Sequence, residues 1–231
     1  MNDATPGSPD GAGALVMPLA TQPCLLRPCA TRSRHTCAVR IAFSGAHRVG
    51  KTTLIERVAE ALPGYALVPE PYHLLQEDGY DFADPPSAED FEAQLERSIV
   101  ELEEAGECAL LDRCPADLLA YLRVGDHDVN AQLERCREAI GLLDLVVLVP
   151  IEEPDRIAVS SHEDLEQRRA VDEELFELLL DEGLAEEVLP VHGDVTTRVA
   201  QVLRRVNELD RSNSHPDDLT HPSPSGLGRD P

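Results

Sequence analysis

Short apolar segments alternate with longer amphipathic segments between residues 39 and 209. The short segments have the length of strands, whereas apolar residues in the longer segments recur every three or four positions, as in helices. Strands are predicted at residues 39–44, 65–68, 108–111, 143–149 and 188–191. Helices are predicted at residues 52–62, 88–104, 165–180 and 195–209, with more than one helix across residues 116–140. Strands that are each followed by helix predict an α/β fold with a five-stranded parallel sheet and helices on both faces.

The start of the helix at residues 88–104 is well marked. Ser87 precedes two acidic residues, Glu89 and Asp90, and this order is typical of an N-cap. A single apolar stripe follows, formed by Phe91, Leu95, Ile99 and Leu102. The stripe predicts that one face of this helix packs on the sheet.

The first predicted strand leads into a glycine-rich segment with the spacing G-x-x-x-x-G-K-T. This spacing is typical of a phosphate-binding loop (P-loop), and the order strand, loop, helix favours it over a chance glycine turn. In a P-loop the backbone N–H groups bind phosphates, the lysine contacts the β- and γ-phosphates, and the next residue's hydroxyl ligates Mg²⁺. We therefore predict binding of ATP with Mg²⁺, and Thr52 as a metal ligand. The predicted nucleotide-binding residues are Gly45, Ala46, His47, Arg48, Val49, Gly50, Lys51, Thr52 and Thr53.

Lys51 is the only lysine of the chain, whose other basic residues are arginines. A compact ammonium group on a flexible stem can follow charge from one phosphate to the next, whereas a guanidinium is a rigid planar fork. The retained lysine therefore supports a catalytic and phosphate-binding role for Lys51. His47, inside the loop, is interpreted as a solvent-facing spacer.

The overall charge limits the class of partner. The chain has 44 Asp and Glu residues against 20 Lys and Arg residues, a net charge of −24. Nucleic acids and anionic membranes require a basic surface, and the arginines are scattered along the chain. We therefore expect a small-molecule substrate, with no nucleic acid polymer and no membrane as partner.

Both ends of the chain have the composition of disordered segments. Residues 1–36 are rich in Ala, Pro, Gly, Ser and Thr and do not begin with the positive charge of a secretory signal, and Met17 is an alternative start. Residues 211–231 are rich in Ser, Pro, His and Asp. We expect a disordered leader at 1–36, one ATP-binding domain at 37–210 and a disordered tail at 211–231. Because no span reaches transmembrane length, we expect a cytoplasmic protein.

Polar residues follow the predicted strands at the edge where ligands bind in a parallel α/β sheet. Asp112 follows an apolar strand and is interpreted as the carboxylate of the Mg²⁺ shell, with a helix cap as the alternative. Arg113 is its neighbour. Glu70 follows the second strand and is a candidate general base toward an acceptor hydroxyl, with an ordinary solvated loop glutamate as the alternative.

Together these motifs resemble the nucleoside and nucleotide kinase group of P-loop proteins. In particular, they resemble bacterial ATP-binding proteins labelled AAA that are allied to nicotinamide riboside kinases and deoxynucleoside kinases. The resemblance extends over roughly residues 38–208. Glu70-Pro71 is similar to the Glu-Pro pair of deoxynucleoside kinases, whose glutamate is the general base. Their base-reading glutamine would fall near Gln94. Asp112-Arg113-Cys114 is similar to their acidic-Arg-Ser triplet. This chain has Asp where the family has Glu, and Cys where the family has Ser, so the substrate class stays open.

Residues 161–172 resemble the lid of such kinases, where arginines close over the transferring phosphoryl group. The resemblance implies a helical lid with Arg168 and Arg169 as catalytic residues, and Arg156 as a weaker candidate. The alternative is an ordinary salt-bridged helix face, because acidic residues lie within helical reach.

Two functions are consistent with these residues. In the first, the protein is an ATP-dependent kinase of a small nucleoside-like or other hydroxyl-bearing metabolite, with Glu70 as base and Glu70, Gln94 and Arg113 holding the acceptor. In the second, it is a nucleotide-dependent binding or regulatory module, or a slow ATPase without an acceptor. A GTPase of the translational type is disfavoured because its N-K-x-D motif needs a second lysine.

Overall fold

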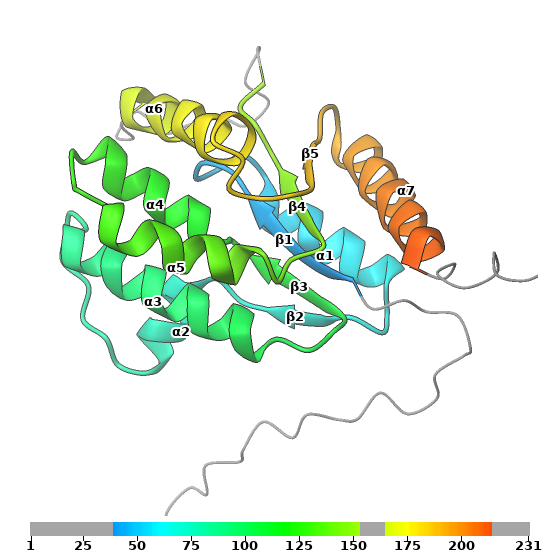
Figure 1. The fold of residues 1–231 in the computed structure, drawn as a ribbon, viewed down its shortest axis with the longest axis horizontal. Coiled ribbons are helices and arrows are strands. Elements are labelled where there is room, and N and C mark those ends of the chain that lie inside the picture. The colour runs from blue at the N-terminus through cyan, green and yellow to red at the C-terminus, as the bar shows by residue number, and fades with distance from the viewer. Residues whose placement is uncertain (1–38, 153–164, 214–231) are drawn as a thin grey trace, which may run out of the picture. The chain divides into compact units, whose positions relative to one another are not determined.

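The chain folds into a parallel five-stranded sheet with helices on both faces (Figure 1), in a computed structural model that describes residues 39–152 and 165–213. The strand order is β2-β3-β1-β4-β5, so the first strand lies at the centre. The strands are β1 Arg40–Ser44, β2 Ala66–Val68, β3 Ala109–Asp112, β4 Leu145–Leu148 and β5 Val188–Pro190. The predicted α/β class and its five parallel strands are confirmed.

The helices form a layer on each side of the sheet. The helix α1 packs against α7 on one side, and α3, α4 and α5 pack together on the other (Figure 1). Their bounds are α1 Lys51–Ala61, α2 Pro71–Glu77, α3 Ala88–Glu104, α4 Pro115–Val124, α5 Asn130–Ile140, α6 Leu165–Phe176 and α7 Val195–Asn213, and a π-helical turn η1 Glu177–Asp181 continues α6. Among the described helices, none is both long and apolar enough to cross a membrane.

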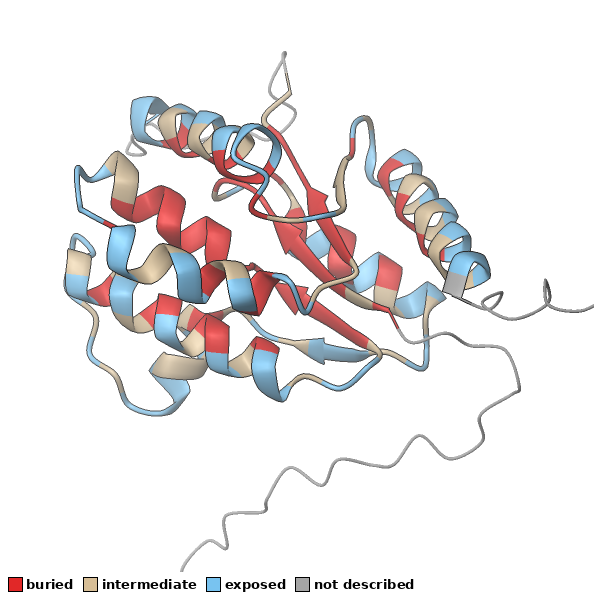
Figure 2. Ribbon diagram, in the orientation of Figure 1, coloured by how far each residue is buried: buried red, intermediate tan, exposed pale blue. Residues whose placement is uncertain are grey.

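The three central strands are buried on both faces, as Figure 2 shows in red. Parallel strands covered by helices on both sides read as continuous apolar runs, and this is why β3 and β4 were predicted from short apolar segments. Ile41, Phe43 and Leu110 are among the largest fully buried side chains. Burial of each such side chain contributes about 1.5–3 kcal/mol. The edge strand β2 is much more exposed.

The register of the strands places four loops at one edge of the sheet. The paired residues near this edge are Phe43 with Asp112, Ser44 with Leu148, and Val68 with Leu111. Glu70 comes two positions after Val68, and Arg113 comes two positions after Leu111, the residue with which Val68 pairs. The register alone brings these two side chains to neighbouring places beside the loop after β1.

The predicted start of α3 is confirmed as a capping box. The Ser87 hydroxyl oxygen accepts a hydrogen bond from the Asp90 backbone N–H at 3.2 Å, and the Asp90 carboxylate accepts one from the Ser87 N–H at 2.7 Å. Two backbone N–H groups that would otherwise lack a partner at the helix start are satisfied in this way. The start of α3 is therefore fixed by its sequence.

Two elements differ from the expected ones. The short helix α2 was not predicted, although Pro71 at its first position is a common helix-start signal. The helix α7 continues to Asn213, beyond the predicted domain end at residue 210. The predicted leader at 1–36, the tail from residue 214 and residues 153–164 of the lid region lie outside the described residues.

Candidate functional site

The P-loop connects β1 to α1 and takes the backbone conformation that its glycines allow. Gly45 has a φ of 150°, and a Cβ atom there would lie 2.4 Å from the Val149 carbonyl oxygen. Gly50 has a φ of 89° and is the N-cap of α1. Both positions favour glycine, the first because a side chain has no room and the second because of its left-handed backbone. The two glycines of the motif are thus required by the fold itself.

Lys51 is buried at the start of α1 and folds back over the loop. Its Nζ donates hydrogen bonds to the carbonyl oxygens of Gly45 at 2.7 Å and Ala46 at 2.8 Å. Burial, together with the charge of the nearby Arg113, lowers the pKa of Lys51 from 10.5 to about 8. Phosphate groups would restore the positive charge, because an adjacent anion favours the protonated amine.

Cationic side chains surround the carbonyl side of the P-loop. Arg168, from α6, donates to the carbonyl oxygens of His47 at 3.0 Å and Arg48 at 3.1 Å. Arg198, from α7, donates to the carbonyl oxygen of Val49 at 2.9 Å. Together with the two bonds from Lys51, every carbonyl from residue 45 to residue 49 accepts a hydrogen bond from a cation. These contacts hold the carbonyl groups in fixed directions and bring positive charge close to the phosphate site.

Thr52 and Asp112, the two residues predicted to hold a metal ion, are in contact. The Thr52 hydroxyl donates to one carboxylate oxygen of Asp112 at 3.2 Å, and the other carboxylate oxygen is buried with no hydrogen-bond partner. Burial also raises the pKa of Asp112. Asp112 is the last residue of β3, while Cys114 caps α4, so the alternative of Asp112 as a helix cap is wrong.

The oxygen atoms of Thr52 and Asp112 fit Mg²⁺, which prefers hard oxygen ligands. A magnesium ion there would satisfy the buried carboxylate oxygen. In the ranges that the structure describes, no cluster of three or more His, Cys, Asp or Glu side chains could hold a metal ion. Magnesium at this position would therefore complete its coordination with phosphate oxygens and water, as it does in other phosphate sites.

Glu70 and Arg113 lie together at the ends of β2 and β3, as the register requires. The Arg113 Nε donates to a carboxylate oxygen of Glu70 in a very short contact. Arg113 has a φ of 82°, an unfavourable backbone for a residue with a side chain, and its N–H is held by the Phe43 carbonyl oxygen. Although burial alone would raise it, the pKa of Glu70 lies below its usual value because of the charge and hydrogen bond of Arg113. Glu70 is therefore an ionised carboxylate with a fixed partner, and the alternative of a solvated loop glutamate is wrong.

Asp117 joins this pair to the P-loop. One of its carboxylate oxygens accepts the Gly45 N–H at 3.0 Å and lies 3.5 Å from the Arg113 guanidinium. The other accepts the Cys114 N–H at 3.0 Å, which completes a capping box at the start of α4. The side chain is fully buried. Asp117 thus sets the position of the P-loop relative to Arg113.

A cavity of about 320 Å³ opens beside Glu70 and Arg113. Gln94 lines it, and its amide nitrogen donates to the Asp90 carbonyl oxygen at 3.1 Å. The rings of Phe91 and Tyr121 stack at a centroid distance of 5.0 Å with an interplanar angle of 5° and form one apolar side. We name this space the acceptor-side cavity. The remaining lining residues are His47, Tyr72, Pro85, Pro86, Leu118 and Gln167.

The interpretation of His47 as a solvent-facing spacer is wrong. Its side chain is half-buried, and its Nδ1 lies 3.2 Å from the Tyr121 hydroxyl. The His47 backbone N–H also donates to that hydroxyl, at 3.3 Å. Tyr121 lies on α4, far away in sequence, and this is why the contact could not be predicted from the loop motif. His47 therefore faces the acceptor-side cavity.

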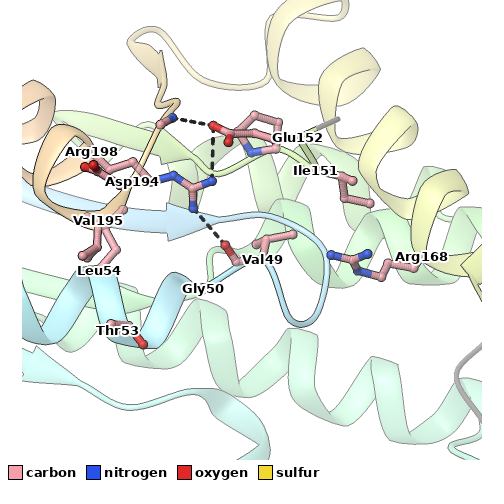
Figure 3. Close-up of a pocket in the computed structure, with 12 residues that line it drawn as sticks. Val49, Gly50, Thr53, Leu54, Ile151, Glu152, Arg168, Asp194, Val195 and Arg198 are labelled. Atoms are coloured by element: carbon pink, nitrogen blue, oxygen red, sulfur yellow. Dashed lines mark hydrogen bonds and ion pairs between the residues drawn. The ribbon is translucent and has the colours of Figure 1, made fainter. Parts of the chain in front are cut away.

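A second cavity, of about 490 Å³, lies on the other side of the P-loop (Figure 3). Val49, Leu54 and Val195 contribute apolar surface to it. Figure 3 shows the Arg198 guanidinium between the Val49 carbonyl and Glu152, whose carboxylate also accepts the Gly193 N–H. These contacts tie the P-loop to the loops after β4 and β5. We name this space the donor-side cavity.

The lid residues have different positions. Arg168 is buried, lines the donor-side cavity, and donates from two of its guanidinium nitrogens to the P-loop carbonyls. Arg169 is exposed and lines neither of the two cavities. Arg156 lies outside the described residues.

Sequence reasoning did not identify three residues of this site, Asp117, Tyr121 and Arg198. Asp117 and Tyr121 follow the Asp112-Arg113 pair on the next helix, and the spacing of Cys114 and Asp117 as a capping box was a readable signal. Arg198 had no such signal, because its position depends on how α7 packs against α1.

Residues 40–198 match a family model described as AAA domain. No curated protein matches the sequence. Among solved structures, the NadR protein in complex with NAD and AMP-PNP has a TM-score of 0.57 and 20% identity, with 80% of this chain and 52% of that chain covered. The chain thus spans about half the length of the NadR chain.

Two further solved structures are covered over their whole length. Deoxyadenosine kinase from M. mycoides has a TM-score of 0.55 and 15% identity, and 74% of this chain and 100% of that chain are covered. Thymidylate kinase from Ehrlichia chaffeensis has a TM-score of 0.54 and 14% identity, with the same coverage of 74% and 100%. At these identities the similarity shows the fold, which is that of P-loop nucleotide kinase-like proteins.

Proposed function

Because the chain belongs to the AAA domain family, we propose that it binds Mg-ATP and acts as a kinase, transferring the γ-phosphoryl group to a small hydroxyl-bearing metabolite. The donor nucleotide would place its phosphates on the P-loop and its nucleoside part in the donor-side cavity. Lys51 would contact the β- and γ-phosphates, while Thr52 and Asp112 would hold Mg²⁺. Magnesium would supply charge neutralisation between the phosphate oxygens.

One observation supports a kinase over a simple ATPase: two cavities flank the same P-loop. Val49 and Gly50 line the donor-side cavity, whereas His47 lines the acceptor-side cavity. An ATPase that uses water needs no second cavity of about 320 Å³. A kinase needs one, because the acceptor hydroxyl must approach the γ-phosphoryl group from the side opposite its leaving group.

The acceptor-side cavity also contains groups suited to proton removal and binding. Glu70 lies close enough to Lys51 to influence its pKa, so the carboxylate is near the expected phosphate position. An ionised carboxylate at this place could accept the proton of an acceptor hydroxyl. Arg113 would orient the acceptor, and Gln94 offers an amide for hydrogen bonds.

The test is an ADP-release assay with Mg-ATP over nucleosides, nucleotides and nicotinamide riboside. Acceptor-dependent release that is lost in a Lys51→Ala variant supports the kinase. Release that is equal with and without every acceptor would instead indicate a slow ATPase. Binding of Mg-ATP without release in any mixture would indicate a nucleotide-dependent binding module.

A further inference from the structure

The helix α4 holds two N–H groups of the P-loop, one through Asp117 and one through Tyr121. The Asp117 carboxylate accepts the Gly45 N–H at 3.0 Å, and the Tyr121 hydroxyl accepts the His47 N–H at 3.3 Å. The two side chains are four positions apart on the helix, so they lie on the same face. One face of α4 therefore sets the backbone of the P-loop at residues 45 and 47.

Tyr121 also belongs to the wall of the acceptor-side cavity. Its ring stacks on Phe91, and the Arg113 guanidinium lies 5.6 Å from the centre of the ring. His47 lines the same cavity, and its Nδ1 lies 3.2 Å from the Tyr121 hydroxyl. A hydroxyl group has one hydrogen and two lone pairs, so it can pair with the backbone N–H and the imidazole at the same time. The wall of the cavity thus contains a pair of residues that leads directly to the P-loop.

The hydrogen bonds of Tyr121 leave room for tightening. At 3.3 and 3.2 Å they are longer than the bonds from Lys51, Arg168 and Arg198 to the loop carbonyls, which range from 2.7 to 3.1 Å. A bond longer than the usual length of about 2.9–3.0 Å gains strength when its partners are brought closer. A molecule packed against the Tyr121 ring and the His47 imidazole would restrict both side chains and press the hydroxyl toward the loop.

We propose that Tyr121 is a positioning residue that couples the two cavities: occupation of the acceptor-side cavity strengthens nucleotide binding on the P-loop through the Tyr121 hydroxyl and His47. This inference rests on the proposed function. A loop that is already fixed loses less conformational freedom when the nucleotide binds, so the affinity rises. The coupling is reciprocal, and the nucleotide raises the affinity for the acceptor by the same factor. The protein then holds Mg-ATP most tightly when an acceptor is present.

The experiment measures nucleotide affinity with and without the acceptor on the full chain. Calorimetry gives the dissociation constant of Mg-AMP-PNP, alone and with a saturating amount of the compound that raises ADP release most. In the wild type we expect this compound to lower the constant by about 5-fold or more. In Tyr121→Phe, which keeps the ring and loses the hydroxyl, the ratio of the two constants should fall to about 1. Tyr80→Phe is the matched control and should keep the wild-type ratio, because Tyr80 lines neither of the two cavities.

Three results would contradict the coupling. Equal constants with and without the acceptor in the wild type would show that the cavities act independently, while the kinase function stands. A wild-type ratio in Tyr121→Phe, even with weaker binding overall, would reduce Tyr121 to a structural support of the loop. ADP release that no compound increases would overturn both the proposed function and this inference.

A second readout needs no nucleotide. The amide proton of His47 is followed by NMR as the acceptor is added to the protein alone. We expect a larger downfield shift in the wild type than in Tyr121→Phe, because only the wild type has a hydroxyl toward which the bond can shorten. The phenylalanine variant keeps the aromatic ring, so the effects of ring currents are matched. Equal shifts in the two proteins would overturn the assignment to the Tyr121 hydroxyl.

Discussion

At the residue scale, Lys51 is the residue that would contact the phosphates under the proposed function, because the chain has no other lysine. We expect Lys51→Ala to remove most of the affinity for Mg-ATP and all turnover. Lys51→Arg should also fail, since a planar fork cannot reproduce the position of an ammonium group that lies within 2.8 Å of two carbonyl oxygens. The measurement is the rise in Tm caused by Mg-ATP. A wild-type rise in the alanine variant would exclude this loop as the triphosphate site.

The lowered pKa of Lys51 predicts how nucleotide affinity depends on pH. In the free protein the amine loses its proton as the pH rises through about 8, whereas bound phosphates favour the protonated form. Affinity for Mg-ADP should therefore fall above pH 8, by up to about tenfold per pH unit, and binding near pH 8.5 should take up a proton. Calorimetry in buffers of different ionisation enthalpy measures this uptake. Equal affinities at pH 7.5 and pH 9.5 would contradict the prediction.

The same shift affects stability with a definite sign. The folded pKa of Lys51 is lower than the unfolded one, so between about pH 8 and 10.5 the unfolded chain binds more protons. The contribution of this residue to the free energy of unfolding therefore increases with pH in that window. Below pH 8 Lys51 is protonated in both the folded and the unfolded state. In that range its buried charge disfavours folding, and the size of this effect does not change with pH. Under the proposed function, nucleotide binding in that range would offset the cost.

Under the proposed function, Glu70 is the residue on which proton transfer would depend. We expect Glu70→Gln to reduce single-turnover transfer to the acceptor by roughly 10²- to 10⁴-fold, because the amide cannot accept a proton. Affinity for Mg-ATP should change little, since Glu70 does not line the donor-side cavity. Transfer of the labelled γ-phosphoryl group is followed by quenched flow. A rate within a few-fold of the wild type would assign the proton to another acceptor or remove the need for a base.

At the element scale, the P-loop depends on two arginines from helices that follow it much later in sequence. Arg198→Met removes the bond to the Val49 carbonyl, and we expect it to weaken Mg-ADP binding by about 10-fold or more, the usual worth of a hydrogen bond to a charged group. Arg205→Met is the matched control, because Arg205 lies on the same helix but pairs with Glu187 and Glu208. Equal Mg-ADP affinities in the two variants would show that Arg198 does not position the loop.

The companion variant Arg168→Met separates two roles of the α6 arginine. If Arg168 positions the loop through the carbonyls of His47 and Arg48, both Mg-ADP affinity and transfer should fall. If it acts only on the transferring phosphoryl group, Mg-ADP affinity should stay the same while kcat falls by roughly 10³-fold. The contacts in this structure favour the first outcome. Dissociation constants from calorimetry and kcat from ADP release distinguish the two.

Most elements of this fold were predictable because their signals are local. The apolar runs of β1, β3 and β4 and the capping box at Ser87 are read within a few residues. The P-loop motif likewise identified Lys51 and Thr52. The contacts of Arg198 and Asp117 with the P-loop were not predictable, since they join residues 149 and 72 positions apart and depend on the packing of whole helices. The short helix α2 was missed because its seven residues are too few for a periodic pattern.

At the scale of the whole molecule, the central position of β1 explains why one loop serves two cavities. The strand pairs with β3 on one side and β4 on the other, so the P-loop meets the loops of both neighbours. The β3 side contributes Asp112 and Arg113, and the β4 side contributes Glu152. Donor and acceptor would therefore meet over the central strand of the sheet.

The buried core predicts which part of the chain is needed for folding and nucleotide binding. Its hydrophobic cluster extends from Val39 to Val206 among the described residues, and α7 ends at Asn213. The segments outside have the Pro-, Ser- and Gly-rich composition of chains that bury little apolar surface. We expect a chain of residues 37–213 to melt cooperatively at the Tm of the full chain and to show the same rise with Mg-ATP. Calorimetric scans of both proteins, with and without the nucleotide, make the comparison.

Ending the chain at residue 210 instead would remove the last residues of α7, and a small drop in Tm is expected from this shorter version alone. A broad or absent transition for residues 37–213 would show that the removed segments pack against the core.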